Sequence, residues 1–99
     1  MIFKISKEAS NDLEKIWLYT IENWPAEQAD RYLNLILDEI EYLCHKPNSG
    51  MGSGYIRKGY LRTKVKSHFI FYKINEKRDE LEIIRILHQQ MDVENRLNE

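Results

Sequence analysis

Alternating hydrophobic and polar side chains at the start of the chain predict a short strand. Phe3 and Ile5 alternate with Lys4 and Ser6, so one face of this segment is apolar. Ser6 is also suited to cap a helix that begins directly after it, because its hydroxyl can accept a hydrogen bond from a free backbone N–H of the first turn. We therefore expect a strand that leads straight into a helix.

Residues 9–44 carry the three- and four-residue spacing of apolar positions that is typical of amphipathic helices. The first helix must end near Trp24, because a residue that precedes a proline is pushed out of the α-helical region. Pro25 then suits the first position of a second helix, where its missing N–H costs nothing. Two helices joined so tightly form an antiparallel hairpin. The predicted buried stripes are Ala9, Leu13, Ile16, Trp17, Thr20 and Trp24 in the first helix, and Ala29, Tyr32, Leu33, Ile36, Leu37, Ile40, Leu43 and Cys44 in the second.

A glycine-rich loop separates the helical half from a run of strands. Residues 46–54 hold three of the four glycines and one of the two prolines. Residues 55–57 have the composition to start a strand. Arg62, Lys64 and Lys66 then alternate with apolar residues, and this pattern predicts a strand with one apolar and one cationic face.

Two more strands complete the predicted sheet. Residues 69–74 are largely apolar on both faces, which is typical of a central strand. The polar residues 75–79 predict a hairpin connection to a strand over residues 81–87, which His88 closes. Residues 91–97 suit either a short terminal helix or a tail.

The predicted order β-α-α-β-β-β describes an α+β fold, with an N-terminal strand and a two-helix antiparallel hairpin packed on one face of a mostly antiparallel sheet. Because 99 residues suffice for a single hydrophobic core, we expect one domain over residues 1–99. The helices can cover only one face of the sheet. Arg62, Lys64 and Lys66 should therefore line the open face.

Composition excludes several classes of protein. The chain is 42% apolar and 31% charged, as in an ordinary globular protein. Its single cysteine, Cys44, excludes an internal disulfide, and its three scattered histidines do not supply a metal site, so we expect no metal and no cofactor. The N-terminus does not resemble a signal peptide, and no apolar run approaches the roughly 20 residues of a membrane helix. We expect a cytoplasmic protein with no membrane partner.

The net charge of −1 hides a strong asymmetry along the chain. Residues 1–54 hold five Lys or Arg against nine Asp or Glu, residues 55–88 hold nine against four, and residues 89–99 hold one against three. This distribution favours an anionic partner for the second half. The alternative is a solvated strand surface on which lysines protect an edge strand from aggregation.

Arg85 and His88 mark the candidate site. Arg85 lies inside an apolar run and must find a partner or reach water, because a buried unpaired charge is costly. His88 adds a group that titrates near neutrality. The three cations of the strand after the loop repeat about every 7 Å, close to the spacing of phosphates along a nucleic acid. His68 opens one strand and His88 closes another, and whether the two meet stays open.

A series of short patterns runs through the chain. They are Ala9 with Asp12-Leu13 and Ile16, Tyr19-Thr20, Trp24 before Gln28-Ala29, Pro47 with Gly50, Gly59-Tyr60-Leu61-Arg62, His68-Phe69-Ile70-Phe71-Tyr72, and Arg85-Ile86-Leu87-His88 with Met91-Asp92. In this order and spacing they resemble the RelE/ParE superfamily of bacterial toxins, and in particular its ParE branch. Pro25 departs from the glycine often found there in the family, which should alter only the turn between the helices.

The resemblance implies a type II toxin that a cognate ParD-like antitoxin, encoded beside it, holds inactive. ParE-like members poison DNA gyrase and trap it on cleaved DNA, so DNA would be reached only through gyrase or the antitoxin. We therefore expect a toxin that acts by binding, with no catalytic residue. The candidates for a surface that faces the target or the antitoxin are Arg62, Lys64, Lys66 and Arg85, with His88 and Met91 at its rim.

The first alternative is an endoribonuclease of the RelE type, which cuts messenger RNA in the ribosome. Such cleavage must activate a 2′-hydroxyl, stabilise charge on the phosphorus and protonate the leaving oxygen. Arg62, Arg85 and His88 would carry these roles. The usual set is incomplete, however, because Gln89 follows His88 where the nuclease branch can have arginine, and residues 89–99 contain no tyrosine. The second alternative is an inactive module that still binds its antitoxin.

Overall fold

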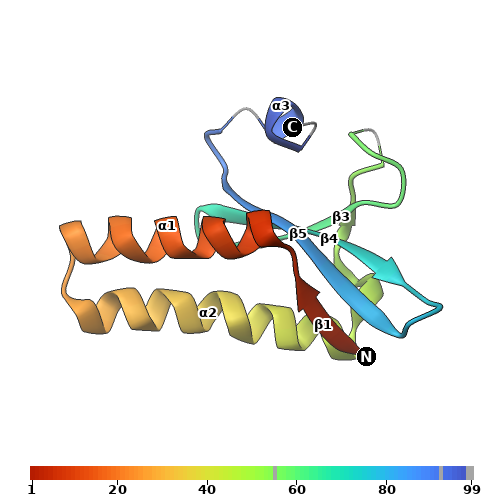
Figure 1. Cartoon of the computed structure of the whole chain (residues 1–99), viewed down its shortest axis with the longest axis horizontal. Coiled ribbons are helices and arrows are strands. Elements are labelled where there is room, and N and C mark those ends of the chain that lie inside the picture. Colours follow the sequence, from red (N-terminus) through yellow and green to blue (C-terminus); the bar gives the residue numbers. More distant parts are fainter. Residues whose placement is uncertain (55, 92, 98–99) are drawn as a thin grey trace.

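The computed structural model describes residues 1–54, 56–91 and 93–97. The chain begins with strand β1 (Ile2–Ile5), which leads into the helical hairpin of α1 (Lys7–Asn23) and α2 (Ala26–His45). A 3-10 turn, η1 (Pro47–Ser49), and strand β2 (Met51–Gly52) follow. Strands β3 (Leu61–Val65), β4 (His68–Asn75) and β5 (Glu80–His88) and the short helix α3 (Val93–Leu97) complete the chain. The α+β fold is confirmed (Figure 1).

The sheet has the strand order β1-β5-β4-β3-β2. β1 runs parallel to β5, whereas the other three pairs are antiparallel, so the prediction of a mostly antiparallel sheet is confirmed. β1 pairs with β5 only as far as Ile5 opposite Ile83. The last part of β5 therefore has a free edge on the side where α1 begins.

The local signals at the ends of the helices act as the sequence indicated. The Ser6 hydroxyl accepts a 3.0 Å hydrogen bond from the Ala9 N–H and caps α1. Pro25 is the cap of α2 rather than its first residue, a difference of one position. The prediction that Trp24 continues the buried stripe is wrong, because its side chain is 54% exposed. α1 and α2 extend past the end of the sheet, so the tip of the hairpin has less to pack against (Figure 1).

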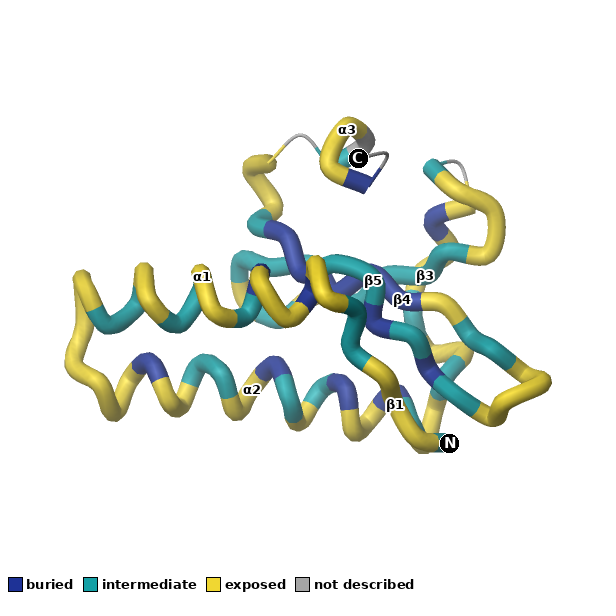
Figure 2. Tube along the Cα trace, in the orientation of Figure 1, coloured by how far each residue is buried: buried dark blue, intermediate teal, exposed yellow. Residues whose placement is uncertain are grey.

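The main core lies between the helical hairpin and the sheet (Figure 2). Ile36 and Ile40 of α2 pack with Ile70, Tyr72 and Ile83 of the sheet, and none of these side chains is exposed. Burying one side chain of this size contributes about 1.5–3 kcal/mol. The predicted stripe of α2 thus becomes the main attachment of the helices to the sheet.

The opposite face of the sheet is only partly open, which corrects the prediction of an open face. A second cluster there joins Phe71 and Leu87 of the sheet with Leu97 of α3, and Ile56 and Tyr60 of the loop before β3 pack against it. Figure 1 shows α3 and this loop on the side of the sheet away from the helical hairpin. Two connecting segments therefore cover apolar residues that the long helices cannot reach.

The glycine-rich segment also differs from the prediction. Met51 and Gly52 form β2 and pair with β3, although the segment was expected to be loop throughout. No strand forms at Ile56 and Arg57, and Tyr55 lies outside the described residues. The buried Tyr72 hydroxyl fixes the start of this segment, because it donates to the Pro47 carbonyl at 2.8 Å and accepts from the Gly50 N–H at 3.0 Å.

Candidate functional site

Arg85 forms a two-pronged ion pair with a carboxylate of the first helix. Its Nε lies 2.8 Å from Asp12 Oδ2 and its Nη2 lies 3.1 Å from Asp12 Oδ1. Asp12 Oδ2 also accepts the backbone N–H of Ile86 at 2.9 Å, at the edge of β5 that β1 leaves free. Arg85 Nη1 donates to the carbonyl of Arg96 in α3. Arg85 thus links α1, β5 and α3, and its position in an apolar strand is explained.

His68 and His88 meet across the first pair of β4 and β5, which resolves the question left open by the sequence. Their rings are nearly perpendicular, with centroids 5.2 Å apart. The Tyr32 hydroxyl of α2 lies 2.7 Å from His68 Nδ1, so this pair faces the helical hairpin. Burial and the neighbouring His88 lower the pKa of His68 to about 4, so His68 is neutral at pH 7.

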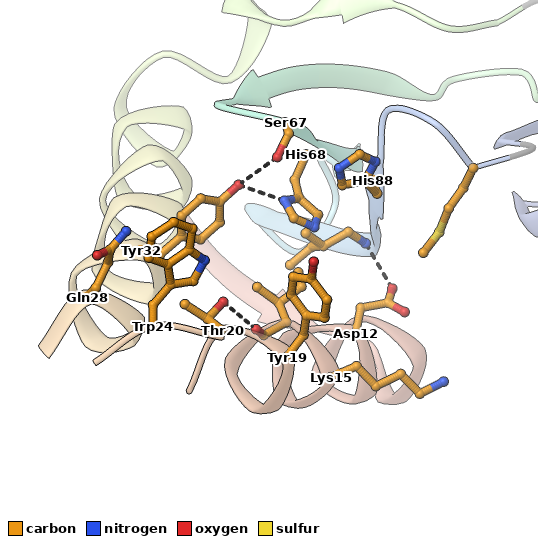
Figure 3. Close-up of a pocket in the computed structure, with 13 residues that line it drawn as sticks. Asp12, Lys15, Tyr19, Thr20, Trp24, Gln28, Tyr32, Ser67, His68 and His88 are labelled. Carbon is orange, nitrogen blue, oxygen red and sulfur yellow. Dashed lines mark hydrogen bonds between the residues drawn. The ribbon is translucent and has the colours of Figure 1, made fainter. Parts of the chain in front are cut away.

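A cavity of about 600 Å³ lies beside this histidine pair, between α1, the first turns of α2 and the ends of β4 and β5 (Figure 3). We call it the hairpin cavity. Its wall is mostly apolar and aromatic. It is formed by Asp12, Lys15, Ile16, Tyr19, Thr20, Trp24, Gln28, Tyr32, Ser67, His68, Ile86, His88 and Met91.

The cations of β3 form a second, separate surface. The Arg62 guanidinium lies 4.9 Å and the Lys64 ammonium 5.9 Å from the centroid of the Phe69 ring. We call Arg62, Lys64 and Phe69 the basic surface. Thr63, between the two cations, donates to Glu39 of α2, so its neighbours point away from the helical hairpin.

Lys66 does not continue the cationic stripe, contrary to the prediction. β3 ends at Val65, and Lys66 lies in the turn to β4 with a φ of 54°, a left-handed backbone conformation. The strand period that the sequence indicated therefore stops one residue before Lys66.

The candidate residues consequently fall into three groups rather than one surface. Arg62 and Lys64 belong to the basic surface, whereas His88 and Met91 line the hairpin cavity on the helical side. Arg85 forms the third group, because it is bound to Asp12 of α1. Within residues 1–54, 56–91 and 93–97, no three His, Cys, Asp or Glu side chains are grouped to hold a metal ion. No helix in these ranges is long and apolar enough to cross a membrane.

Sequence reasoning did not assign roles to Asp12 and Tyr32. Asp12 lies three residues after Ala9 and four before Ile16, so it is a carboxylate beside the apolar stripe of α1. Such a position is a usable signal, because a carboxylate there needs a partner. In the sequence, only the opposite charge links Asp12 to Arg85, which lies 73 residues away.

Residues 3–93 match the family described as the ParE toxin of the type II toxin–antitoxin system parDE. The chain belongs to this family. It is 36% identical to Toxin ParE1 of Caulobacter vibrioides over 90 residues, 91% of each chain. It is 33% identical to Toxin ParE1 of Mycobacterium tuberculosis over 95 residues, 96% of each chain. The resemblance seen in the sequence is therefore confirmed, and the protein is the toxin component of a type II system.

The fold of this ParE-family toxin also matches a solved structure. The match is to a chain of the chromosomal ParDE toxin–antitoxin system from P. aeruginosa, with a TM-score of 0.76 and 20% sequence identity. It covers 89% of this chain and 95% of that chain. At this identity the likeness establishes the fold alone.

Proposed function

We propose that this ParE-family toxin inhibits DNA gyrase by binding to it, and that a ParD-like antitoxin neutralises it in the bacterial cytoplasm. The toxin acts as one domain of residues 1–99, without metal or cofactor. Membership of the ParE family supports gyrase as the target. The arrangement of the candidate residues supports binding over RNA cleavage.

The preference for binding over RNA cleavage rests on the separation of Arg62, Arg85 and His88. An RNA-cleaving site needs its acid, base and charge-stabilising groups within hydrogen-bond reach of one phosphate. Arg62 stacks on Phe69 on the face of the sheet away from the helical hairpin, whereas His88 lines the hairpin cavity on the other side. Arg85 already binds Asp12 with two nitrogens. These three side chains do not converge on one point.

The antitoxin contacts the basic surface through an acidic segment that folds on binding. Arg62 and Lys64 present two positive charges beside the partly buried Phe69 ring, and Lys66 adds a third charge in the adjacent turn. A segment that alternates carboxylates with apolar side chains would match this surface. Disordered segments that order on binding suit such extended contacts.

A supercoiling assay tests the gyrase proposal. We expect the purified toxin to inhibit supercoiling by gyrase, and equimolar antitoxin to restore it. The inhibited reaction should also accumulate cleaved DNA. Full supercoiling at a large toxin excess would refute the proposal.

Transcript mapping after toxin expression tests the ribonuclease alternative. We expect transcripts to remain intact during growth arrest, and His88→Ala to have no effect on their integrity. Cleavage at fixed codon positions that His88→Ala abolishes would establish the alternative and exclude a toxin that acts only by binding. Expression without growth arrest would instead indicate an inactive antitoxin-binding module.

A further inference from the structure

The hairpin cavity has features of a protein-binding site that the contacts proposed above do not use. Large side chains around its mouth are exposed to solvent: Tyr19 at 67%, Trp24 at 54% and Met91 at 45%. Exposed apolar groups gathered at a concavity are typical of sites that bind a partner. Its volume of about 600 Å³ exceeds that of any single side chain.

Several polar groups in the wall are already bonded within the protein. The Tyr32 hydroxyl and His68 bind each other at 2.7 Å, and the Thr20 hydroxyl donates to the Ile16 carbonyl at 2.7 Å. The carboxylate of Asp12 is paired with Arg85 and also accepts the Ile86 N–H. A ligand that enters the cavity therefore meets mainly apolar and aromatic surface.

The electrostatic character of the wall also favours an uncharged ligand. His68 stays neutral at pH 7, because burial and His88 lower its pKa to about 4. Asp12 and Arg85 offset each other. Among the Lys, Arg, Asp and Glu side chains of the wall this leaves Lys15, which is exposed to solvent at the rim. A buried charge on a ligand would lack a partner here and would be costly.

The hairpin cavity and the basic surface lie on opposite sides of the sheet. Thr63 and His68 face the helical hairpin through their bonds to Glu39 and Tyr32. Arg62 and Lys64 point the other way and contact Phe69. The protein thus offers two surfaces of different chemistry, one suited to an acidic segment and one suited to uncharged apolar side chains.

We propose that the hairpin cavity binds large uncharged side chains, aromatic or aliphatic, of the toxin's protein target. Tyr19 and Met91 contact these side chains directly. This inference rests on the proposed function, in which that target is gyrase and the acidic segment of the antitoxin takes the basic surface. Because the contact is apolar, target binding should depend little on salt.

Two double variants with similar losses of exposed apolar surface test the inference. Tyr19→Ala with Met91→Ala removes side chains from the cavity mouth. Leu18→Ala with Tyr42→Ala is the control, since these side chains are 43% and 51% exposed and do not line the cavity. We expect the cavity variant to need at least about tenfold more toxin for half-inhibition of supercoiling, because central interface side chains dominate binding energy. The control variant should match the wild type.

Two further measurements separate the possible outcomes. Melting curves confirm that both variants fold, and antitoxin affinity should stay within about twofold of the wild type, well below a tenfold change of 1.4 kcal/mol. Full inhibition by the cavity variant, with gyrase inhibited by the wild type, would overturn the inference and leave the proposed function intact. Lost antitoxin affinity with unchanged inhibition would assign the cavity to the antitoxin instead.

Growth arrest on expression gives a readout that does not assume gyrase. A wild-type toxin that arrests growth but leaves supercoiling intact would refute the proposed function. In that case, a target contact at the cavity would still be supported if the cavity variant failed to arrest growth while the control variant, at equal protein level, arrested it. Equal growth arrest by both variants would overturn it.

Discussion

Arg85 is held in its strand by groups from distant parts of the chain. Asp12 pairs with it from α1 and the carbonyl of Arg96 accepts from it in α3. The side chains of the pair are only 15% and 8% exposed, so neither charge has much access to water. Removing one partner of such a pair leaves an uncompensated charge, whereas the intact pair contributes little by itself. The role of Asp12 is thus to neutralise the charge of Arg85, rather than to add stability through the ion pair itself.

We expect Asp12→Ala to lower the free energy of unfolding by about 3–5 kcal/mol, because it removes the carboxylate that neutralises Arg85 and leaves the Ile86 N–H without its acceptor. Urea unfolding measures the change. Glu14→Ala, at an exposed site on the same helix, is the control and should change stability by less than about 0.5 kcal/mol. The double variant Asp12→Ala with Arg85→Met should recover part of the loss. Equal midpoints for Asp12→Ala and wild type would refute this role.

The sequence predicted the need of Arg85 for a partner but not which residue meets it. An arginine in an apolar run is a local signal, whereas the identity of Asp12 depends on where β1 stops pairing with β5. The meeting of His68 and His88 likewise depends on strand register. Residue chemistry is readable along the chain, but pairs of distant residues require the tertiary arrangement.

The connection between α2 and β2 shows how one buried hydroxyl positions an element. Tyr72 of β4 bonds to both Pro47 and Gly50, so the chain leaves α2 at a fixed point on the sheet. A Cβ at position 50 would clash with the Tyr72 hydroxyl and lie 2.9 Å from the Arg62 carbonyl oxygen. Gly50 is therefore required by close approach, without any unusual backbone angle.

We expect Gly50→Ala to destabilise the protein by about 1–3 kcal/mol, because the clash must displace Tyr72 or the strand that carries Arg62. Gly52→Ala is a matched control, since a Cβ there meets no atom within 4 Å. Chemical denaturation of both variants measures the difference. A stability for Gly50→Ala equal to that of Gly52→Ala would show that the connection adapts freely.

Elements were predicted well where a strong local signal marks their ends. Pro25 fixed the turn of the helical hairpin to within one residue, and the polar residues 75–79 gave the β4–β5 connection. The pairing of Met51 and Gly52 with β3 was missed, because two residues have no periodicity. The end of β3 before Lys66 was missed because a lysine in a left-handed turn leaves no pattern in the sequence.

At the scale of the whole molecule, the charge asymmetry of the sequence becomes a spatial one. The acidic half of the chain builds the helical hairpin, and the basic half builds β3, β4 and β5, which carry Arg62 and Lys64 on one face. Surface charges interact across a Debye length of about 8 Å at physiological salt, so an acidic segment bound at the basic surface gains from several cations together. Binding of the antitoxin should therefore respond to salt in proportion to the number of these cations.

Removing charges at the edge of the basic surface tests whether the salt dependence of antitoxin binding follows the number of cations. We expect Lys64→Gln with Lys66→Gln to weaken antitoxin binding at low salt by about 0.2–1 kcal/mol for each charge, since both side chains are exposed. The difference from wild type should shrink as the salt concentration rises, because screening removes the same interactions. Lys7→Gln with Lys46→Gln makes the same change in net charge at exposed sites on the helical side, and should leave both affinity and salt dependence unaltered. Titration calorimetry across a salt series measures these effects. Parallel salt responses for wild type and both variants would mean that the antitoxin holds the toxin by apolar contacts, and that the acidic-segment proposal is wrong.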